Sequence, residues 1–244
     1  MKLIVLRAGD AAAPVAARRG EFFSWITREV GDAWTGDWHE HDVRTDAPLP
    51  GPRDADGFVM TGSSSSVTER APWMLRAEEL IRGIAEAGTP LFGICFGHQM
   101  VGQALGGLVA KNPRGREIGT VEVRLVPQDP LDEIFDGLPH GTQRFTANHT
   151  HVDSVVELPP GARLLATTEK EAHAAFAIGK AIKCVQFHPE LDGDSMRGYV
   201  EARAHLIEGE GGDAQAVLEG VADAPHGAST LRSFVRHVVL PRTR

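Results

Sequence analysis

The stretch PLFGICFGHQMVG, residues 90–102, decides the fold of this chain. It joins an apolar run typical of a buried strand to a helix-like segment, and Cys95 stands at the junction between Gly93 and Gly97. Either the cysteine is a small core residue, or the glycines allow a strained corner that exposes a nucleophile. A sharp strand-to-helix turn needs small neighbours, because Cβ atoms would collide there. The amino terminus of the following helix would also lower the pKa of a thiol. We therefore predict that Cys95 is a nucleophile.

The segments before this turn predict an α/β fold with a parallel sheet. Short apolar runs at residues 2–6, 57–62 and 89–95 are typical of strands covered on both faces. Helical patterns lie between them at residues 18–31 and 71–88, the second with a proline in its first turn and a glycine at its end. Strands that alternate with helices predict parallel pairing with right-handed crossovers.

The pattern changes after Gly107. Alternating apolar and polar residues predict an added antiparallel portion. Its strands are expected at residues 118–126, 143–158, 163–169, 173–179 and 181–187. Helical spacing returns at residues 195–207 and 228–240, with a loop expected at 209–214. We find no internal repeat or long linker and predict one domain.

Composition excludes several classes of function. The 244 residues carry a formal net charge of −8, which argues against nonspecific binding to nucleic acid. The first ten residues hold only four consecutive apolar residues, too few for a signal peptide, and no run approaches the length of a membrane span. We therefore expect a cytoplasmic protein with reduced cysteines. Cys184 lies in a strand-like run and is expected to be plain core.

A thiolate nucleophile needs a base and a group that orients the base. In the run FHPE, His188 directly follows a predicted strand, and Glu190 can fold back to accept a hydrogen bond from the imidazole. Taken singly, His188 could instead be a satisfied histidine at a strand end, and Glu190 a solvated carboxylate. The backbone N–H of Phe96 is the first candidate donor to an oxyanion. Gly62 is a second, unless its segment is only a flexible Gly/Ser loop.

These motifs together resemble the class I glutamine amidotransferases, the triad-type glutaminase domains, and in particular free-standing GMP-synthase-like members. The segments GICFGHQ (93–99), FHPE (187–190) and MTGSSSSV (60–67) match the nucleophile turn, the His-Pro-Glu motif and the oxyanion loop of that family. The resemblance implies a flavodoxin-like, mostly parallel sheet. It also implies a catalytic domain over residues 1–190, leaving 191–244 as a helical extension packed on the same domain.

The resemblance also implies roles for individual residues. Those with an implied role are Cys95 (nucleophile), His188 (base), Glu190 (orienter), Gly62 and Phe96 (oxyanion donors), Gln99 (beside the substrate), Thr150, His151 and Asp153 (whose backbone would hold the main-chain groups of glutamine) and Glu117 (substrate ammonium). The implied reaction is hydrolysis of the glutamine side-chain amide through a γ-glutamyl thioester, without metal or organic cofactor.

Alternatives remain open at this point. The sequence holds no G-x-x-x-x-G-K-[ST] phosphate loop of an ATP-using synthetase. If the ammonia is used, as the family resemblance implies, a separate synthetase subunit must therefore accept it. A free-standing γ-glutamyl amide hydrolase or peptidase would share the same triad, and so would a catalytically weak regulatory relative. The run HTHVD (149–153) also resembles the start of a metallo-β-lactamase metal motif, but Ser154 stands where that motif needs a histidine.

Overall fold

The computed structural model describes residues 1–128 and 130–243. The strands are β1 Lys2–Arg7, β2 Asp37–Asp42, β3 Gly57–Met60, β4 Leu91–Ile94, β5 Leu108–Lys111, β6 Glu117–Leu125, β7 Arg144–His151, β8 Asp153–Glu157, β9 Ala162–Thr167, β10 Ala175–Ile178 and β11 Ile182–Val185. The α-helices are α1 Ala13–Arg19, α2 Phe22–Val30, α3 Pro72–Ala87, α4 Phe96–Ala104, α5 Gly193–Gly209, α6 Ala214–Gly220 and α7 Pro225–Phe234.

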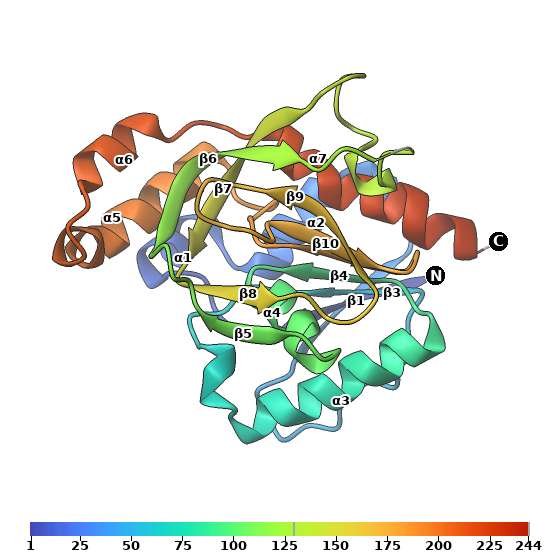
Figure 1. Cartoon of the computed structure of the whole chain (residues 1–244). Coiled ribbons are helices and arrows are strands. Elements are labelled where there is room, and N and C mark those ends of the chain that lie inside the picture. Colours follow the sequence, from blue (N-terminus) through green and yellow to red (C-terminus); the bar gives the residue numbers. More distant parts are fainter. Residues whose placement is uncertain (129, 244) are drawn as a thin grey trace.

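One large sheet runs through the molecule in the order β2-β1-β3-β4-β11-β10-β9-β6-β7 (Figure 1). The half from β2 to β11 is parallel and has the flavodoxin-like strand order. The half from β11 to β7 is antiparallel. The predicted fold class is thus confirmed, and β11 links the two halves because it is parallel to β4 and antiparallel to β10.

Helices cover both faces of this sheet and enclose two apolar cores. Buried side chains of α1, α2, α5 and α7 pack on one face, around Trp25 and Phe234. Those of α3 and α4 pack on the other face, together with β5 and β8, around Met74 and Met100. The amphipathic patterns of the sequence account for these layers, since each helix turns its apolar stripe to the sheet.

Besides the short elements α1, β5 and α6, which were not predicted, two strands depart from the sequence-based expectations. The strand β2 was not predicted, because its sequence DWHEHD is almost wholly polar; it forms the edge of the sheet, where one side of a strand faces water. The expected strand over residues 143–158 divides at Val152. Its first part, β7, stays in the large sheet, whereas β8 leaves it and pairs with β5 in a separate two-stranded sheet.

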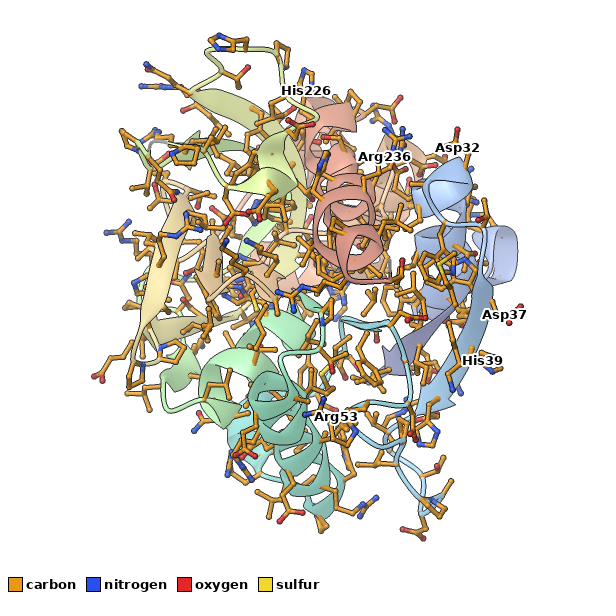
Figure 2. All side chains as sticks on the ribbon, turned by 90° about the vertical axis from the view of Figure 1, so that its right-hand side faces the viewer. Asp32, Asp37, His39, Arg53, His226 and Arg236 are labelled. Carbon is orange, nitrogen blue, oxygen red and sulfur yellow. The ribbon has the colours of Figure 1, made fainter. Side chains whose placement is uncertain are left out.

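The C-terminal helices pack against the amino-terminal part of the chain. In α7, Leu231 and Phe234 are fully buried in the core that also contains Trp25 of α2. Just beyond α7, Arg236 lies 3.4 Å from a carboxylate oxygen of Asp32, which follows α2 (Figure 2).

Among the described residues, no helix combines the length and apolar character that a membrane crossing requires.

Candidate active site

Cys95 occupies the turn between β4 and α4 at the carboxyl edge of the parallel strands. Its φ of 50° is a positive value that few residues other than glycine adopt. A Cβ on Gly93 would come within 2.8 Å of the carbonyl oxygen of Gly97, and one on Gly97 within 2.4 Å of that of Met60. The turn therefore has the strained geometry that the two glycines predict, and the neighbouring strand β3 leaves no room for larger residues.

His188 and Glu190 follow β11, the strand beside β4. The imidazole Nδ1 of His188 lies 2.7 Å from Oε1 of Glu190, and both side chains are buried. His188 Nε2 is buried and has no hydrogen-bond partner in the described part of the chain. With Nδ1 held by the carboxylate, Nε2 is the nitrogen left to exchange a proton with a reacting group.

Two neighbours fix the position of His188. Its backbone N–H donates to the carbonyl oxygen of Asn148 (2.8 Å), and the Asn148 side-chain amide donates to the carbonyl oxygen of Leu191 (2.8 Å). On the other side, the ring of Phe22 stacks on the imidazole at a centroid distance of 6.4 Å. The loop of the triad is thus tied to β7 by a side chain that the sequence analysis did not single out.

The charges of the triad residues shift one another's pKa values. Burial would raise the pKa of the Cys95 thiol, but the neighbouring His188, followed by His151, brings it below its usual value. Burial opposes protonation of His188, yet the charges of Glu190 and then Cys95 raise its pKa to about 10. The lowered pKa of the thiol and the raised pKa of the imidazole both favour transfer of the proton from Cys95 to His188. Burial alone raises the pKa of Cys184, whose exposure of 0% confirms it as core.

The predicted oxyanion donors lie next to Cys95. A Cβ on Gly62 would stand 3.0 Å from Cε1 of His188 and 3.8 Å from Cβ of Cys95, so the backbone of Gly62 lies directly against both side chains. Phe96 is the first residue of α4, where the backbone N–H has no partner within the helix. Thr61 fixes the loop, since its hydroxyl accepts from the N–H of Ala8 and donates to the carbonyl of Gly62 (both 3.0 Å).

The predicted substrate residues form one wall beside the thiol. The carbonyl oxygen of Thr150 lies 4.0 Å from the Cys95 sulfur. The side-chain amide of Gln99 donates to the carbonyl oxygen of Asp153 (2.8 Å) and to Oε1 of Gln186 (3.1 Å). The Asp153 carboxylate accepts from the hydroxyl of Ser66. These contacts bring Gln99, Thr150 and Asp153 together beside Cys95. Their contacts with a substrate stay predictions.

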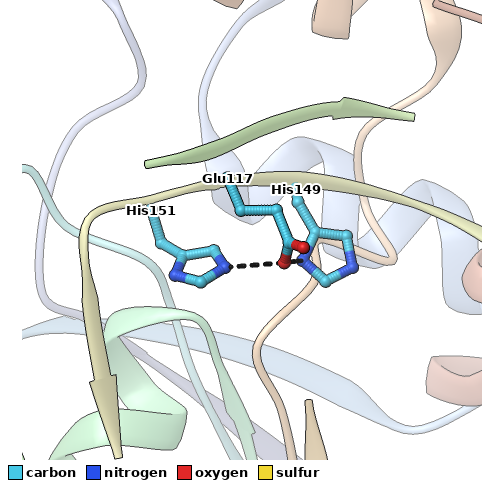
Figure 3. A group of neighbouring side chains, drawn as sticks. All are labelled: Glu117, His149 and His151. Carbon is cyan, nitrogen blue, oxygen red and sulfur yellow. Dashed lines mark hydrogen bonds and ion pairs between the residues drawn. The ribbon is translucent and has the colours of Figure 1, made fainter. Parts of the chain in front are cut away.

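Glu117 lies behind this wall, between two histidines (Figure 3). Its Oε2 is 3.1 Å from Nε2 of His151 and 3.0 Å from Nδ1 of His149, and its Oε1 accepts from the hydroxyl of Thr168 (2.6 Å). The two histidines outweigh burial and bring the pKa of Glu117 well below its usual range. The Glu117 carboxylate is thus bonded to side chains of the protein itself. Its predicted contact with a substrate ammonium stays a prediction.

The same three side chains form the group that could hold a metal ion, since their ligand atoms lie within 4.8 Å of one another. The metallo-β-lactamase pattern is not assembled around them. Asp153 bonds Ser66 instead of joining the group, and the Ser154 hydroxyl donates to Glu171 (2.7 Å). His151 is the charged member: burial opposes its protonation, but Glu117, followed by Glu171, raises its pKa. Burial lowers the pKa of His149.

The thiol lies where two cavities meet. The first, here called the His188 lobe, measures about 310 Å³ and is lined by Asp10, Ala11, Ala12, Ala13, Phe22, Arg44, Ser63, Ser64, Ser65, Cys95, Thr150, His188, Tyr199 and Arg203. The second, the Gln99 lobe, measures about 400 Å³ and is lined by Ser63, Ser64, Ser65, Ser66, Cys95, Gln99, Arg116, Thr150, His151, Val152, Asp153, Arg203 and Leu206. The cleft thus gives a substrate one site on each side of the sulfur.

Sequence reasoning missed several residues of this cleft. Phe22 and Asn148 contact His188, and Tyr199 and Arg203 of α5 line the His188 lobe. The hydroxyl of Tyr199 accepts from the N–H of Ala12 (3.2 Å). No motif identifies them, although Tyr199 is the only tyrosine in the sequence. Their role depends on α5 folding back over the strand edge.

Comparison with known proteins agrees with this geometry. The model of the family "Glutamine amidotransferase class-I" matches residues 35–203. The chain belongs to this family. The match extends past residue 190, the predicted domain boundary, into α5. Class I glutamine amidotransferases and their relatives are amide-hydrolysing enzymes, and this chain is an enzyme of that kind.

Individual relatives of this glutamine amidotransferase domain fall into two groups. Gamma-glutamyl peptidase 4 of Arabidopsis thaliana is 28% identical over 202 residues, which are 78% of each chain. A glutamine-hydrolysing GMP synthase of Leifsonia xyli is 40% identical over 138 residues, which are 55% of this chain and 26% of that protein. The matched segment thus spans about a quarter of that synthase but most of the peptidase.

Solved structures show the same fold. A glutamine amidotransferase from Thermotoga maritima superposes with a TM-score of 0.74 at 24% identity, over 98% of both chains. A glutamine amidotransferase from Methylobacillus flagellatus gives a TM-score of 0.67 at 21% identity, over 99% of this chain and 92% of that chain.

Proposed function

We propose that this chain hydrolyses the γ-amide of a γ-glutamyl substrate through a thioester on Cys95. The observation that carries the proposal is the buried triad at the strand edge, with Cys95 on a strained turn and His188 held at 2.7 Å from Glu190. The shifted pKa values support it, because a thiolate and an imidazolium are the protonation states with which the reaction begins.

The proposed reaction has two halves. The Cys95 thiolate forms a bond to the γ-carbonyl carbon, and the N–H groups of Gly62 and Phe96 stabilise the oxyanion. His188 gives its proton to the departing nitrogen as the C–N bond breaks, which leaves a γ-glutamyl thioester. Water then loses a proton to His188 and attacks the thioester, and glutamate leaves as the thiolate returns. Glu190 keeps the imidazole in place throughout.

Glutamine is the first candidate substrate, with ammonia as the leaving group. The likeness to the amidotransferase portion of GMP synthases supports it, and a separate acceptor enzyme would then use the ammonia. Subunits of this kind work slowly until their partner docks, as the family resemblance implies. In that case the chain alone should turn over glutamine slowly.

A free-standing γ-glutamyl peptidase is the second candidate. The match over most of the length of gamma-glutamyl peptidase 4 favours it, since that alignment covers 78% of both chains. The His188 lobe, of about 310 Å³, also provides more space than ammonia requires. The two candidates share the triad and differ only in the leaving group.

Incubation of the purified chain with glutamine and with γ-glutamyl dipeptides tests the proposal. Released glutamate should depend on Cys95, so that Cys95→Ala remains folded but is inactive. Intact-mass measurement of a quenched reaction should show a γ-glutamyl adduct on the wild type and none on Cys95→Ala. Equal activity of the two proteins would refute the proposed nucleophile.

A further inference from the structure

The two lobes of the cleft receive different parts of a substrate. His188 lines one lobe only, and the proposed mechanism has this histidine protonate the leaving nitrogen. The leaving group therefore departs into the His188 lobe, and the glutamyl half lies in the Gln99 lobe. A water molecule occupies about 30 Å³ of liquid, and ammonia is of similar size. A lobe of about 310 Å³ is large enough for an amino acid or a dipeptide.

Arg203 of α5 lines both lobes, and its neighbour Tyr199 places its guanidinium on the side of the His188 lobe. Its guanidinium carbon lies over the ring of Tyr199, 4.7 Å from the centroid, and Tyr199 lines the His188 lobe but not the Gln99 lobe. Its Nη1 is buried and finds no hydrogen-bond acceptor in the described part of the chain. Burial lowers the pKa of Arg203, and the neighbouring Tyr199 and Cys95 only partly offset that effect.

The other arginines of the cleft are neutralised by the protein itself. Arg44 pairs with Asp10 and Asp42, its Nη1 and Nη2 lying 2.7 and 2.8 Å from their carboxylates. Arg116 makes a two-pronged pair with Glu210 at 2.9 Å on both arms. Arg203 has no ion pair with any described carboxylate, so its fork-shaped donor set is available to an anionic group of the substrate.

We propose that Arg203 binds the carboxylate of the departing amine, which favours the second of the two candidate substrates, γ-glutamyl peptides, over glutamine. The proposal rests on the proposed function, because it assigns the leaving group of that reaction. In each turnover, water cleaves a γ-glutamyl peptide to glutamate and a peptide or amino acid with a free amine. The stacking of Arg203 on Tyr199 holds the guanidinium in the lobe that this amine enters.

A pair of matched substrates tests this inference. γ-Glutamylglycine and γ-glutamylglycinamide have the same size and differ only in the negative charge of the leaving group. We expect the wild type to prefer the glycine compound by about 10–100-fold in kcat/KM, the range that a charge-assisted hydrogen-bonded pair provides. Arg203→Met should abolish that preference, so that the ratio of the two kcat/KM values falls to about one. Arg203→Lys should retain part of it, because a lysine keeps the charge but loses the fork.

Arg53→Met is the matched control. Arg53 is exposed on the loop between β2 and β3 and lines neither lobe (Figure 2), so its loss removes one positive charge from the protein without touching the cleft. The rates on both compounds should equal those of the wild type. That outcome shows that the net charge of the protein does not set the preference.

Two results would overturn the inference while leaving the proposed function intact. Equal wild-type rates on glycine and glycinamide compounds would show that the leaving carboxylate is not recognised. An equal loss on both compounds in Arg203→Met would show that Arg203 supports the glutamyl half or the fold. By contrast, if the wild type released no glutamate from either compound or from glutamine, the proposed function itself would fail.

Discussion

Two histidine–carboxylate pairs flank the thiol of Cys95, and they differ in which ring nitrogens are free. In the pair of His188 and Glu190, the carboxylate holds Nδ1, and Nε2 has no partner in the described chain. In the pair of His151 and Glu117, both nitrogens are engaged, Nδ1 by the carbonyl oxygen of Asp153 (3.0 Å) and Nε2 by Glu117 (3.1 Å). The first imidazole can therefore move a proton, whereas the second can supply only its charge.

The sequence spacing of the two pairs explains the difference. His188 and Glu190 are two residues apart on a loop, so the carboxylate approaches one side of the ring and leaves the other side open. His151 and Glu117 lie opposite each other on β7 and β6, and the neighbouring strand β8 closes the remaining side. The same residue types thus give a base in one place and a fixed positive charge in the other.

The largest predicted effect separates the two histidines. His188→Asn should lower kcat by about 10⁴-fold, because no other group can protonate the leaving nitrogen. His151→Asn should lower kcat/KM near pH 7 by a much smaller factor, because the thiol loses one of the positive charges that lower its pKa. Steady-state kinetics on the best substrate measures both. Comparable losses in the two variants would remove the distinction between base and charge.

Glu190→Gln gives the next largest effect and changes the pH profile. The wild type should gain activity as pH rises through the lowered thiol pKa and lose it above about pH 10, where His188 loses its proton. Without the Glu190 charge the pKa of His188 falls, so the alkaline limb should move to lower pH. We expect a loss of kcat of about 10²–10⁴-fold, measured from pH 5 to 11. An unmoved alkaline limb would show that another group raises the pKa of His188.

Glu117→Gln tests the second pair alone. Without this carboxylate the pKa of His151 falls, so the positive charge beside the thiol weakens and the thiol pKa rises. The acidic limb of kcat/KM should move to higher pH, with the plateau rate nearly kept. The alkaline limb is the internal control, since it belongs to the other pair. A fall of the plateau without a shift of the limb would indicate a direct contact with substrate.

The smallest effect concerns the thiol outside both pairs. Cys184 is fully buried, and its pKa is raised by burial, so it should resist alkylation while Cys95 reacts quickly. Cys184→Ala should keep activity within about twofold and cost about 1–2 kcal/mol of unfolding free energy, because it leaves a small cavity. Iodoacetamide labelling read by peptide mass spectrometry, together with urea unfolding, measures both. Rapid labelling of Cys184 in the native protein would contradict the buried assignment.

Much of the fold follows from local patterns in the sequence. Apolar runs identified β1, β3 and β4 because strands covered on both faces exclude polar residues. The polar strand β2 escaped this reasoning, because its place at the sheet edge comes from pairing with β1 and not from burial. The division between β7 and β8 was not predicted either, since a single run of alternating apolar and polar residues contributes one strand to each of two sheets.

The candidate site divides in the same way. The motifs around Cys95, Gly62 and His188 were readable because each satisfies a local demand: room at a tight turn, a free N–H, or a carboxylate two residues from a ring. The partners of Glu117 could not be predicted from the sequence, because they are set by the register of β6 against β7. Arg203 could not be predicted either, because it lines the cleft beside the thiol only where α5 folds back over the carboxyl edge of the sheet.

The sequence by itself therefore determined the α/β class, the strained turn at Cys95 and the residues that we predict to form the triad. Steric limits and hydrogen-bond reach act over a few residues, and a sequence records them directly. Tertiary structure alone decided which charges surround the thiol, which imidazole keeps a free nitrogen and which cation the leaving-group lobe presents. These depend on strand register and helix packing, which bring together residues far apart in the chain.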